Sequence, residues 1–449
     1  MSLPGRGTWA ACHPCGVRLC VAAMHWTDMI RQQLPIDSPV NLFAFLAAIV
    51  AIILWLSEVR ALQGFFRYFP PLIWTYFVPM FCSTLGIIPN SADGQPLYGF
   101  ILKIILPVVI VLLLVPTEAR SIARLGPKAL VAMLIGTAGI VVGAAASFGF
   151  FQSVLPAGAL PPGTWKGIAA LSASWIGGSP NMAAVAVSLN TDGTLFGKMV
   201  VVDTVCAYTW LGILVGLTAW QDRFDRSVGA DSRVVKELSE RLSTRQATGG
   251  RPIRMVDFVT MLAVGFVVAQ VCLHAGGWIA ARVEQAEVAG GLWRTLRLSQ
   301  VLSGFGWGVL LITATSIALS FTRLRGLGDT GATSVGNAGL YLLLTTFGAQ
   351  ADLRLIEVHD LWLFAIGAVW LLIHIAVLLV GVRLLRAPLF MAATASMANV
   401  GGTASAPVVA AAFHPSLAPV GLLMAILGGI LGTPVALLIV AKICAAIGA

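Results

Sequence analysis

Twelve apolar runs, all poor in charged residues, dominate this chain and fall into two sets of six. They cover residues 40–57, 71–88, 97–115, 127–152, 165–189, 195–219, 257–275, 301–321, 333–350, 357–382, 388–412 and 417–443. A helix needs about 20 apolar residues to cross the hydrocarbon of a bilayer. Because lipid offers no hydrogen bonds, each segment must satisfy its own backbone groups. The pattern therefore predicts an all-α polytopic membrane protein with about 10–12 transmembrane segments.

Composition supports this prediction and excludes several other classes of protein. Only 10% of the residues are charged, against roughly 25% in an average soluble domain. The net charge of +9 comes from basic residues spread among short loops, which is typical of membrane proteins and not of nucleic-acid binders. The chain has no Gly-x-x-x-x-Gly-Lys loop, metalloprotease motif or Gly-x-Ser-x-Gly elbow. We therefore expect neither enzymatic activity nor a cofactor, apart from a coupling ion.

A polar stretch, residues 221–254, separates the two sets of apolar runs. It is rich in basic residues, namely Arg223, Arg226, Arg233, Lys236, Arg241, Arg245, Arg251 and Arg254. Basic loops lie on the cytoplasmic side of a membrane, so the stretch is interpreted as a solvated cytoplasmic linker. The sequence then divides into a poorly ordered tail (1–39), a first membrane repeat (40–220), the linker, and a second repeat (255–449).

The fifth run of each half carries nearly the same motif. Residues 172–185 read SASWIGGSPNMAAV, and residues 396–409 read SMANVGGTASAPVV. Paired glycines permit a positive φ, and Pro180 and Pro407 each remove a backbone donor, so both helices should break at this motif. Broken backbone inside a membrane is tolerated only where protein buries it or a watery cavity borders it. The motif thus predicts two broken intramembrane segments.

Loop charge favours an inverted arrangement of the halves. If all six runs of each half crossed the membrane, the basic loop at 120–128 would lie outside, while the nearly uncharged loops 89–96 and 153–163 would lie inside. That distribution opposes the positive-inside rule. If each broken segment enters and leaves on one side, the assignments reverse and the halves become inverted repeats. One additional helix would correct the distribution equally well.

The polar residues beside the two breaks form the predicted site. Half-helix N-termini attract anions, and unwound carbonyls with side-chain oxygens suit Na⁺. The candidate residues are Ser174, Gly177, Gly178, Ser179, Asn181, Asp203, Asn399, Gly401, Gly402, Thr403 and Ser405. Among them, Asp203, Asn181 and Thr403 are the candidate Na⁺ ligands. The alternative is close helix packing, which small residues also promote.

Asp203 lies inside the apolar run that directly follows the first broken segment. An acidic residue at the centre of a membrane helix costs about 2.5–3.5 kcal/mol on insertion scales, which favours a function. The alternative is a hydrogen-bonded carboxyl group that caps a neighbouring helix. His374 is interpreted as a packed imidazole bonded to a backbone carbonyl, and Trp175 as a packing residue.

The two glycine motifs, with Val-Val-Asp203-Thr after the first, resemble those of the domain of unknown function 819 family of bacterial and plastid membrane proteins. The resemblance extends from about residue 40 to the C-terminus. This family is similar in architecture to sodium/bile-acid symporters, sodium/glutamate symporters and cation/proton antiporters. The resemblance implies an inverted-repeat core with two broken crossover segments and an elevator-like motion against a second domain. Those relatives often carry an acidic residue in the second crossover, but residues 391–413 contain none.

Together these features predict a secondary active transporter of a small, anionic organic solute, coupled to Na⁺ or H⁺. We expect a homodimer in the inner (plasma) membrane. One alternative is a cation/proton antiporter without an organic substrate, in which Asp203 alternates between H⁺ and a metal cation. Another is a membrane scaffold that transports nothing and acts through the linker.

Overall fold

Each of the twelve apolar runs contains helix in the computed structural model. It describes residues 36, 38–68, 71–89, 96–117, 122, 125–230, 254–289, 298–300, 302–351, 354, 360–414 and 417–448. The first half contains α2 (Pro39–Glu58), α3 (Gln63–Tyr68), α4 (Pro71–Thr84), α5 (Pro96–Phe100), α6 (Leu106–Leu114), α8 (Gly126–Val154), α9 (Thr164–Gly177), α10 (Ser179–Ser188) and α11 (Gly193–Gly216). The second half contains α14 (Met255–Ala289), α16 (Gly304–Ser320), α17 (Ala332–Gln350), α18 (Leu361–Leu384), α19 (Leu389–Val400), α20 (Gly402–Phe413), α21 (Ala418–Val435) and α22 (Ala441–Ile447). The protein is therefore all-α, as predicted.

Seven helices within the described ranges are long and apolar enough to cross a membrane. An eighth span results if α16 and the 3₁₀ turn Arg323–Thr330, which meet at 93°, form one crossing. The arms of the two broken helices, α9–α10 and α19–α20, have 10 to 14 residues each, which is too short for a crossing by any one of them. The chain is a multi-pass membrane protein with two broken helices.

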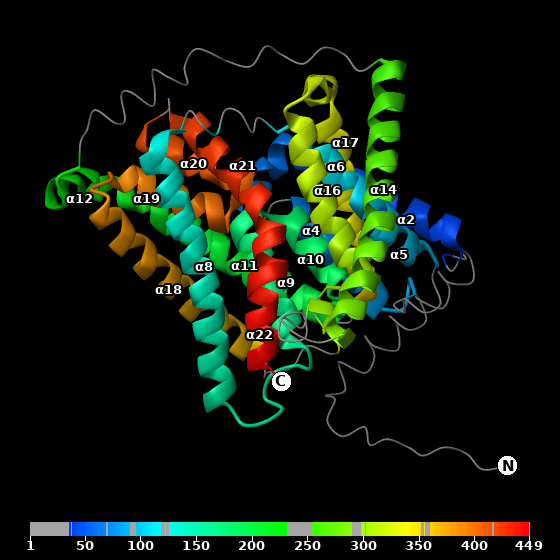
Figure 1. Ribbon diagram of the computed structural model, residues 1–449. Coiled ribbons are helices and arrows are strands. Elements are labelled where there is room, and N and C mark those ends of the chain that lie inside the picture. The colour runs from blue at the N-terminus through cyan, green and yellow to red at the C-terminus, as the bar shows by residue number, and fades with distance from the viewer. Residues whose placement is uncertain are drawn as a thin grey trace, which may run out of the picture.

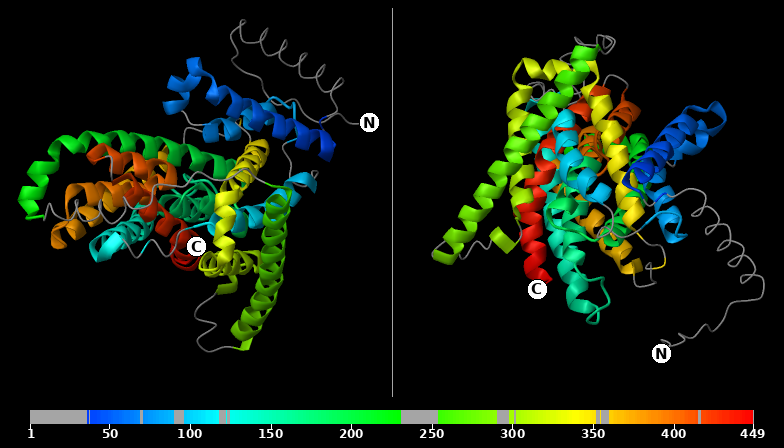
Figure 2. Two further views of the ribbon diagram at one scale, coloured as in Figure 1. Left: turned by 90° about the horizontal axis from the view of Figure 1, so that it is seen from above. Right: turned by 90° about the vertical axis from the view of Figure 1, so that its right-hand side faces the viewer.

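The helices gather into two modules, and each half of the chain contributes to both. The scaffold module consists of α2, α4, α5, α6, α14, α16 and α17, and the core module consists of α8–α11 and α18–α22. Figure 1 shows the core module on the left and the scaffold module on the right, and Figure 2 shows the same division from above. In each half the first three runs enter the scaffold module and the last three enter the core module. This agrees with an internal repeat, while the inversion of the two halves stays a prediction.

The core module is held together by close contact between α8 and α18. The indole N–H of Trp370 donates to the carbonyl of Ile140 at 2.7 Å, and Gly143 faces the same ring. On its other side the Trp370 ring packs against Trp175, with 4.7 Å between ring centroids. Small residues let membrane helices approach closely and bury such aromatic side chains. This packing places α9, which precedes the first break, at the centre of the core module.

The start of the polar stretch is ordered and attached to the core module. Residues Gln221–Val228 form α12, in which the Asp225 carboxylate accepts the backbone N–H of Leu389 at 2.7 Å. Leu389 is the first residue of α19, so this contact caps the helix that leads into the second break. Residues 231–253 of the expected linker and residues 1–35 of the expected tail lie outside the described residues.

Candidate functional site

Both predicted breaks are present, and each occurs at the glycine pair. Gly178 has φ +91° and ψ 175° between α9 and α10, and Gly402 has φ +65° where α20 begins. A side chain disfavours a positive φ, so glycine is the residue suited to these positions. The first helix is therefore interrupted after Gly177, and the second after Val400.

The two breaks meet at the centre of the core module. A Cβ atom built on Gly402 would lie 3.6 Å from the Cα atom of Gly178. Helices α10 and α20 both begin at this meeting point. The first N–H groups of a helix have no carbonyl in an earlier turn to bond, and its N-terminus carries about half a positive charge. Two helix starts are thus brought together, as the motifs predicted.

Three hydroxyl groups beside the meeting point have no hydrogen-bond partner among the described residues. They belong to Ser179 at the start of α10 and to Thr403 and Ser405 in the first turn of α20. Ser179 and Ser405 are half-buried, and Thr403 is exposed. A hydroxyl can donate one hydrogen bond and accept two. These three side chains are therefore available to a ligand.

Asn181, a candidate Na⁺ ligand, is engaged within the protein. Its Oδ1 atom accepts from the backbone N–H of Thr433 at 3.1 Å and from the Thr433 hydroxyl at 2.6 Å. Its Nδ2 group donates to the Gly177 carbonyl at 2.9 Å. Both lone pairs of the oxygen are in use, so in this structure Asn181 joins α10 to α21 and covers one carbonyl at the break.

Asn399 faces away from the meeting point. It is fully buried, its Oδ1 accepts from the Thr137 hydroxyl at 3.0 Å, and its Nδ2 donates to the Ala395 carbonyl at 3.0 Å. The same Nδ2 lies 3.3 Å from the sulfur of Met133. Because Met133 and Thr137 belong to α8, Asn399 fixes α19 against α8 and contributes to the site by position.

Asp203 is hydrogen-bonded to the last turns of α9. The Ser174 hydroxyl donates to one carboxylate oxygen at 2.7 Å, and the Trp175 indole N–H donates to the other at 2.9 Å. Asp203 is half-buried. The sequence interpretation of Trp175 as a packing residue missed this bond. A buried indole N–H needs an acceptor. Asp203, the only acidic residue in the next apolar run, was the sequence signal that could have identified this acceptor.

His374 is a packed imidazole, as interpreted from the sequence. Its Nδ1 lies 3.0 Å from the Gly136 carbonyl, and its Nε2 lies 2.9 Å from the Ser396 hydroxyl. The Trp210 indole N–H donates to the same hydroxyl at 2.9 Å. These hydrogen bonds connect α8, α18, α19 and α11 one turn before the second break.

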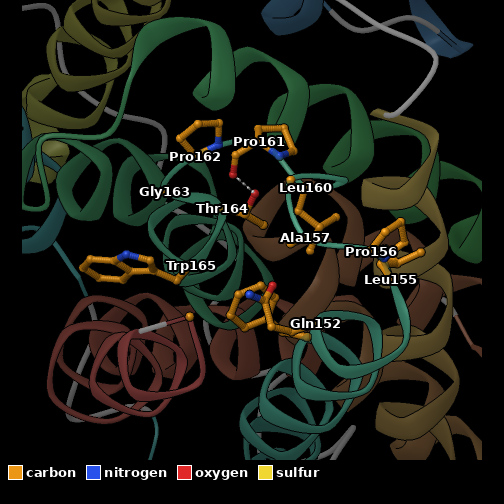
Figure 3. A pocket seen from close by; sticks show the side chains of 13 residues that line it. Gln152, Leu155, Pro156, Ala157, Leu160, Pro161, Pro162, Gly163, Thr164 and Trp165 are labelled. Carbon is orange, nitrogen blue, oxygen red and sulfur yellow. Dashed lines mark hydrogen bonds between the residues drawn. The ribbon is translucent and has the colours of Figure 1, made fainter.

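A pocket of about 180 Å³ lies at the far end of α9 from the break. Figure 3 shows its wall, which comes from the end of α8, the proline-rich loop and the start of α9, with Thr164 donating to the Pro161 carbonyl at 2.6 Å. Gly448 completes the wall. Thr164 and Gly177 are the two ends of a 14-residue helix, which is about 20 Å long. This pocket is therefore separate from the meeting point of the breaks.

Comparison with known proteins agrees with the motifs. A family model described as a protein of unknown function, DUF819, matches residues 44–445. The chain belongs to the DUF819 family. It is also 25% identical over 367 residues to the uncharacterized membrane protein YjcL of Bacillus subtilis (strain 168), a match that covers 79% of this chain and 86% of that protein. The resemblance inferred from the two glycine motifs is confirmed, whereas the similarity to symporters and antiporters stays a prediction.

Proposed function

We propose that this DUF819 protein is a secondary transporter of a small anionic organic solute, coupled to Na⁺ or H⁺, in the inner membrane. The observation that carries the proposal is the meeting of two helix breaks, with Gly402 directly against Gly178. Broken helices that meet inside a membrane are the usual form of a transporter site. The proposal includes no enzymatic step and no cofactor.

The site suits an anion because of its backbone. Two helix N-termini direct N–H groups and partial positive charge to one place, which stabilises a carboxylate or phosphate without a basic side chain. The unpartnered hydroxyls of Ser179, Thr403 and Ser405 can add hydrogen bonds to the same ligand. A neutral solute would gain less from this arrangement, so we favour an anionic one.

The coupling ion is assigned to the side of the site that Asp203 occupies. A carboxylate has about four acceptor positions, and two are taken by Ser174 and Trp175. The others can bind Na⁺ or a proton. Because Asp203 is bonded to α9, a change in its occupancy would act on the helix that ends at Gly177. The candidate Na⁺ roles of Asn181 and Thr403 stay predictions.

Transport by purified protein in liposomes tests this proposal. A set of organic anions is offered under imposed Na⁺ or H⁺ gradients, and uptake dependent on one gradient is expected. The paired substitution Ser179→Ala with Thr403→Ala should reduce uptake at least tenfold. Ser153→Ala is the matched control, since that hydroxyl bonds the Phe150 carbonyl of its own exposed helix turn. If the uptake of every anion were independent of both the Na⁺ and the H⁺ gradient, the proposed coupling would be contradicted.

Cation/proton antiport without an organic solute is the second candidate, and the half-buried carboxylate of Asp203 favours it. A pH-sensitive dye inside vesicles distinguishes the two functions, because antiport moves protons when only a metal cation is added. Asp203→Asn should abolish that signal. Unchanged proton movement in this variant would reject Asp203 as the exchanging group.

A further inference from the structure

Helix α14 presents an uncovered face at the edge of the scaffold module. With 35 residues it is the longest helix in the described part of the chain, and it packs against α16 and α6 on one side. Figure 2 shows it at the margin of the molecule in both views. Its outer face includes Val267, Val271 and Trp278, which are 62%, 63% and 63% exposed. Apolar exposure of this kind is ordinary for a helix in lipid.

Two polar residues interrupt this apolar face. Gln270 and His274 lie one helical turn apart within the segment 258–281, which contains no charged residue. Gln270 is at the middle of that segment, and its side chain is half-buried at the border of the face, while His274 is exposed. Polar and ionisable side chains are costly in hydrocarbon and almost always face the interior of a helix bundle. Their exposure here indicates a surface that another helix covers.

The hydrogen bonding of the pair is self-complementary. Nδ1 of His274 lies 2.8 Å from the Gln270 backbone carbonyl. A carbonyl only accepts, so Nδ1 carries the proton and Nε2 of the neutral ring is an acceptor. The Gln270 side-chain amide has no partner among the residues described, and it supplies two N–H donors. One face thus offers a donor and an acceptor a turn apart.

We propose that a second copy of this chain docks on the outer face of α14. Around a two-fold axis, the Gln270 amide of each copy donates to His274 Nε2 of the other, and the two bonds are equivalent by symmetry. Val267 and Val271 pack beside them. Lipid tails offer no hydrogen bond, whereas an identical face gives each Gln270 amide an acceptor and each His274 Nε2 a donor. The inference is independent of the transported solute and gives the expected homodimer a specific interface.

The double variant Gln270→Leu/His274→Leu tests this interface. Leucine suits both a helix and a lipid-facing surface, so the single copy should fold as before. The dimer fraction is measured in liposomes by single-molecule photobleaching over a range of protein-to-lipid ratios. Two interhelical bonds in a membrane are worth about a tenfold change in the dissociation constant, and a rise of at least that size is expected. Val142→Leu on the exposed face of α8 is the matched control and should change nothing.

Cross-linking supplies a second readout that does not depend on the energy of the bonds. Val271→Cys should form a dimer with a bifunctional maleimide, whereas Val142→Cys should not exceed the wild-type background. A wild-type protein that is monomeric at every ratio overturns the proposal and assigns the face to lipid or to residues outside those described. A dimer that the double variant leaves intact, without cross-linking at residue 271, overturns it as well.

Discussion

At the scale of single residues, the site contains two kinds of polar group. Asn181, Asn399 and Asp203 already have their hydrogen bonds inside the protein. The hydroxyls of Ser179 and Thr403 have none among the residues described. Removing a side chain that holds such bonds leaves its buried partners unsatisfied and lowers the stability of the protein. Removing a hydroxyl that has no partner lowers it little. Substitutions at the two kinds of residue should therefore separate stability from transport.

Asn181→Ala should destabilise the protein. The change leaves the buried Thr433 hydroxyl without the Asn181 acceptor and removes the donor to the Gly177 carbonyl. Each unsatisfied buried group costs about 1–3 kcal/mol, so a clear drop in the thermal unfolding temperature in detergent is expected. Ser179→Ala, two residues away, should stay within about 0.5 kcal/mol of the wild type. Equal unfolding temperatures for both variants would contradict the assignment of Asn181 as a positioning residue.

Substitutions at Asp203 should show how it is held. In Asp203→Asn the side-chain oxygen can still accept from Trp175, and the new amide can donate to the rotated Ser174 hydroxyl. Asp203→Ala instead leaves the indole N–H without an acceptor, at a cost of about 1–3 kcal/mol. Trp175→Phe in the alanine background should recover part of that loss. Denaturation of the four variants as a double-mutant cycle measures the coupling, and zero coupling would exclude the bond.

At the scale of the elements, backbone conformation at the breaks should decide the response to alanine. Gly178 has φ +91° with ψ 175°, a region that other residues essentially do not occupy. Gly402 has φ +65°, close to the left-handed region, which costs a residue with a side chain about 1–2 kcal/mol. Gly178→Ala should therefore destabilise more than Gly402→Ala in thermal unfolding. Gly212→Ala, inside α11 with nothing near its Cβ position, should be neutral or stabilising. The reverse order at the two breaks would contradict this explanation.

The elements themselves were largely predictable from the sequence. Apolar length located all twelve helical runs, and glycine with proline located both breaks, because these signals are local. The direction in which each side chain points, by contrast, is not determined by the local sequence. Asn399 and Thr403 lie four residues apart on either side of the second break, yet Asn399 points into α8 and Thr403 is exposed. The partners of Asn181 and Ser396, which are Thr433 and Trp210, come from other helices. Periodicity could not identify them.

At the scale of the whole molecule, the two modules meet along α10 and α11 on one side and α6, α16 and α17 on the other. The rings of Phe196 and Phe347 stack across this boundary, with 4.0 Å between centroids. Both breaks and Asp203 lie in the core module, so a rigid displacement of that module would carry the entire site. This arrangement agrees with the elevator-like motion that the family resemblance implies, which requires the boundary to slide.

A disulfide across the boundary should therefore stop transport. A Cβ atom built on Gly193 of α11 would lie 2.9 Å from the Cβ atom of Gln350 in α17. Cysteines form a disulfide at Cβ separations of about 3.5–4.5 Å, so a small shift accommodates one here. Gly193→Cys/Gln350→Cys should lose gradient-driven uptake under oxidising conditions and regain it on reduction. Each single cysteine variant, which cannot form the bridge, should be unaffected by the oxidant. Full uptake in the oxidised double variant, with the bridge verified by mass spectrometry, would show that transport needs no movement at this boundary.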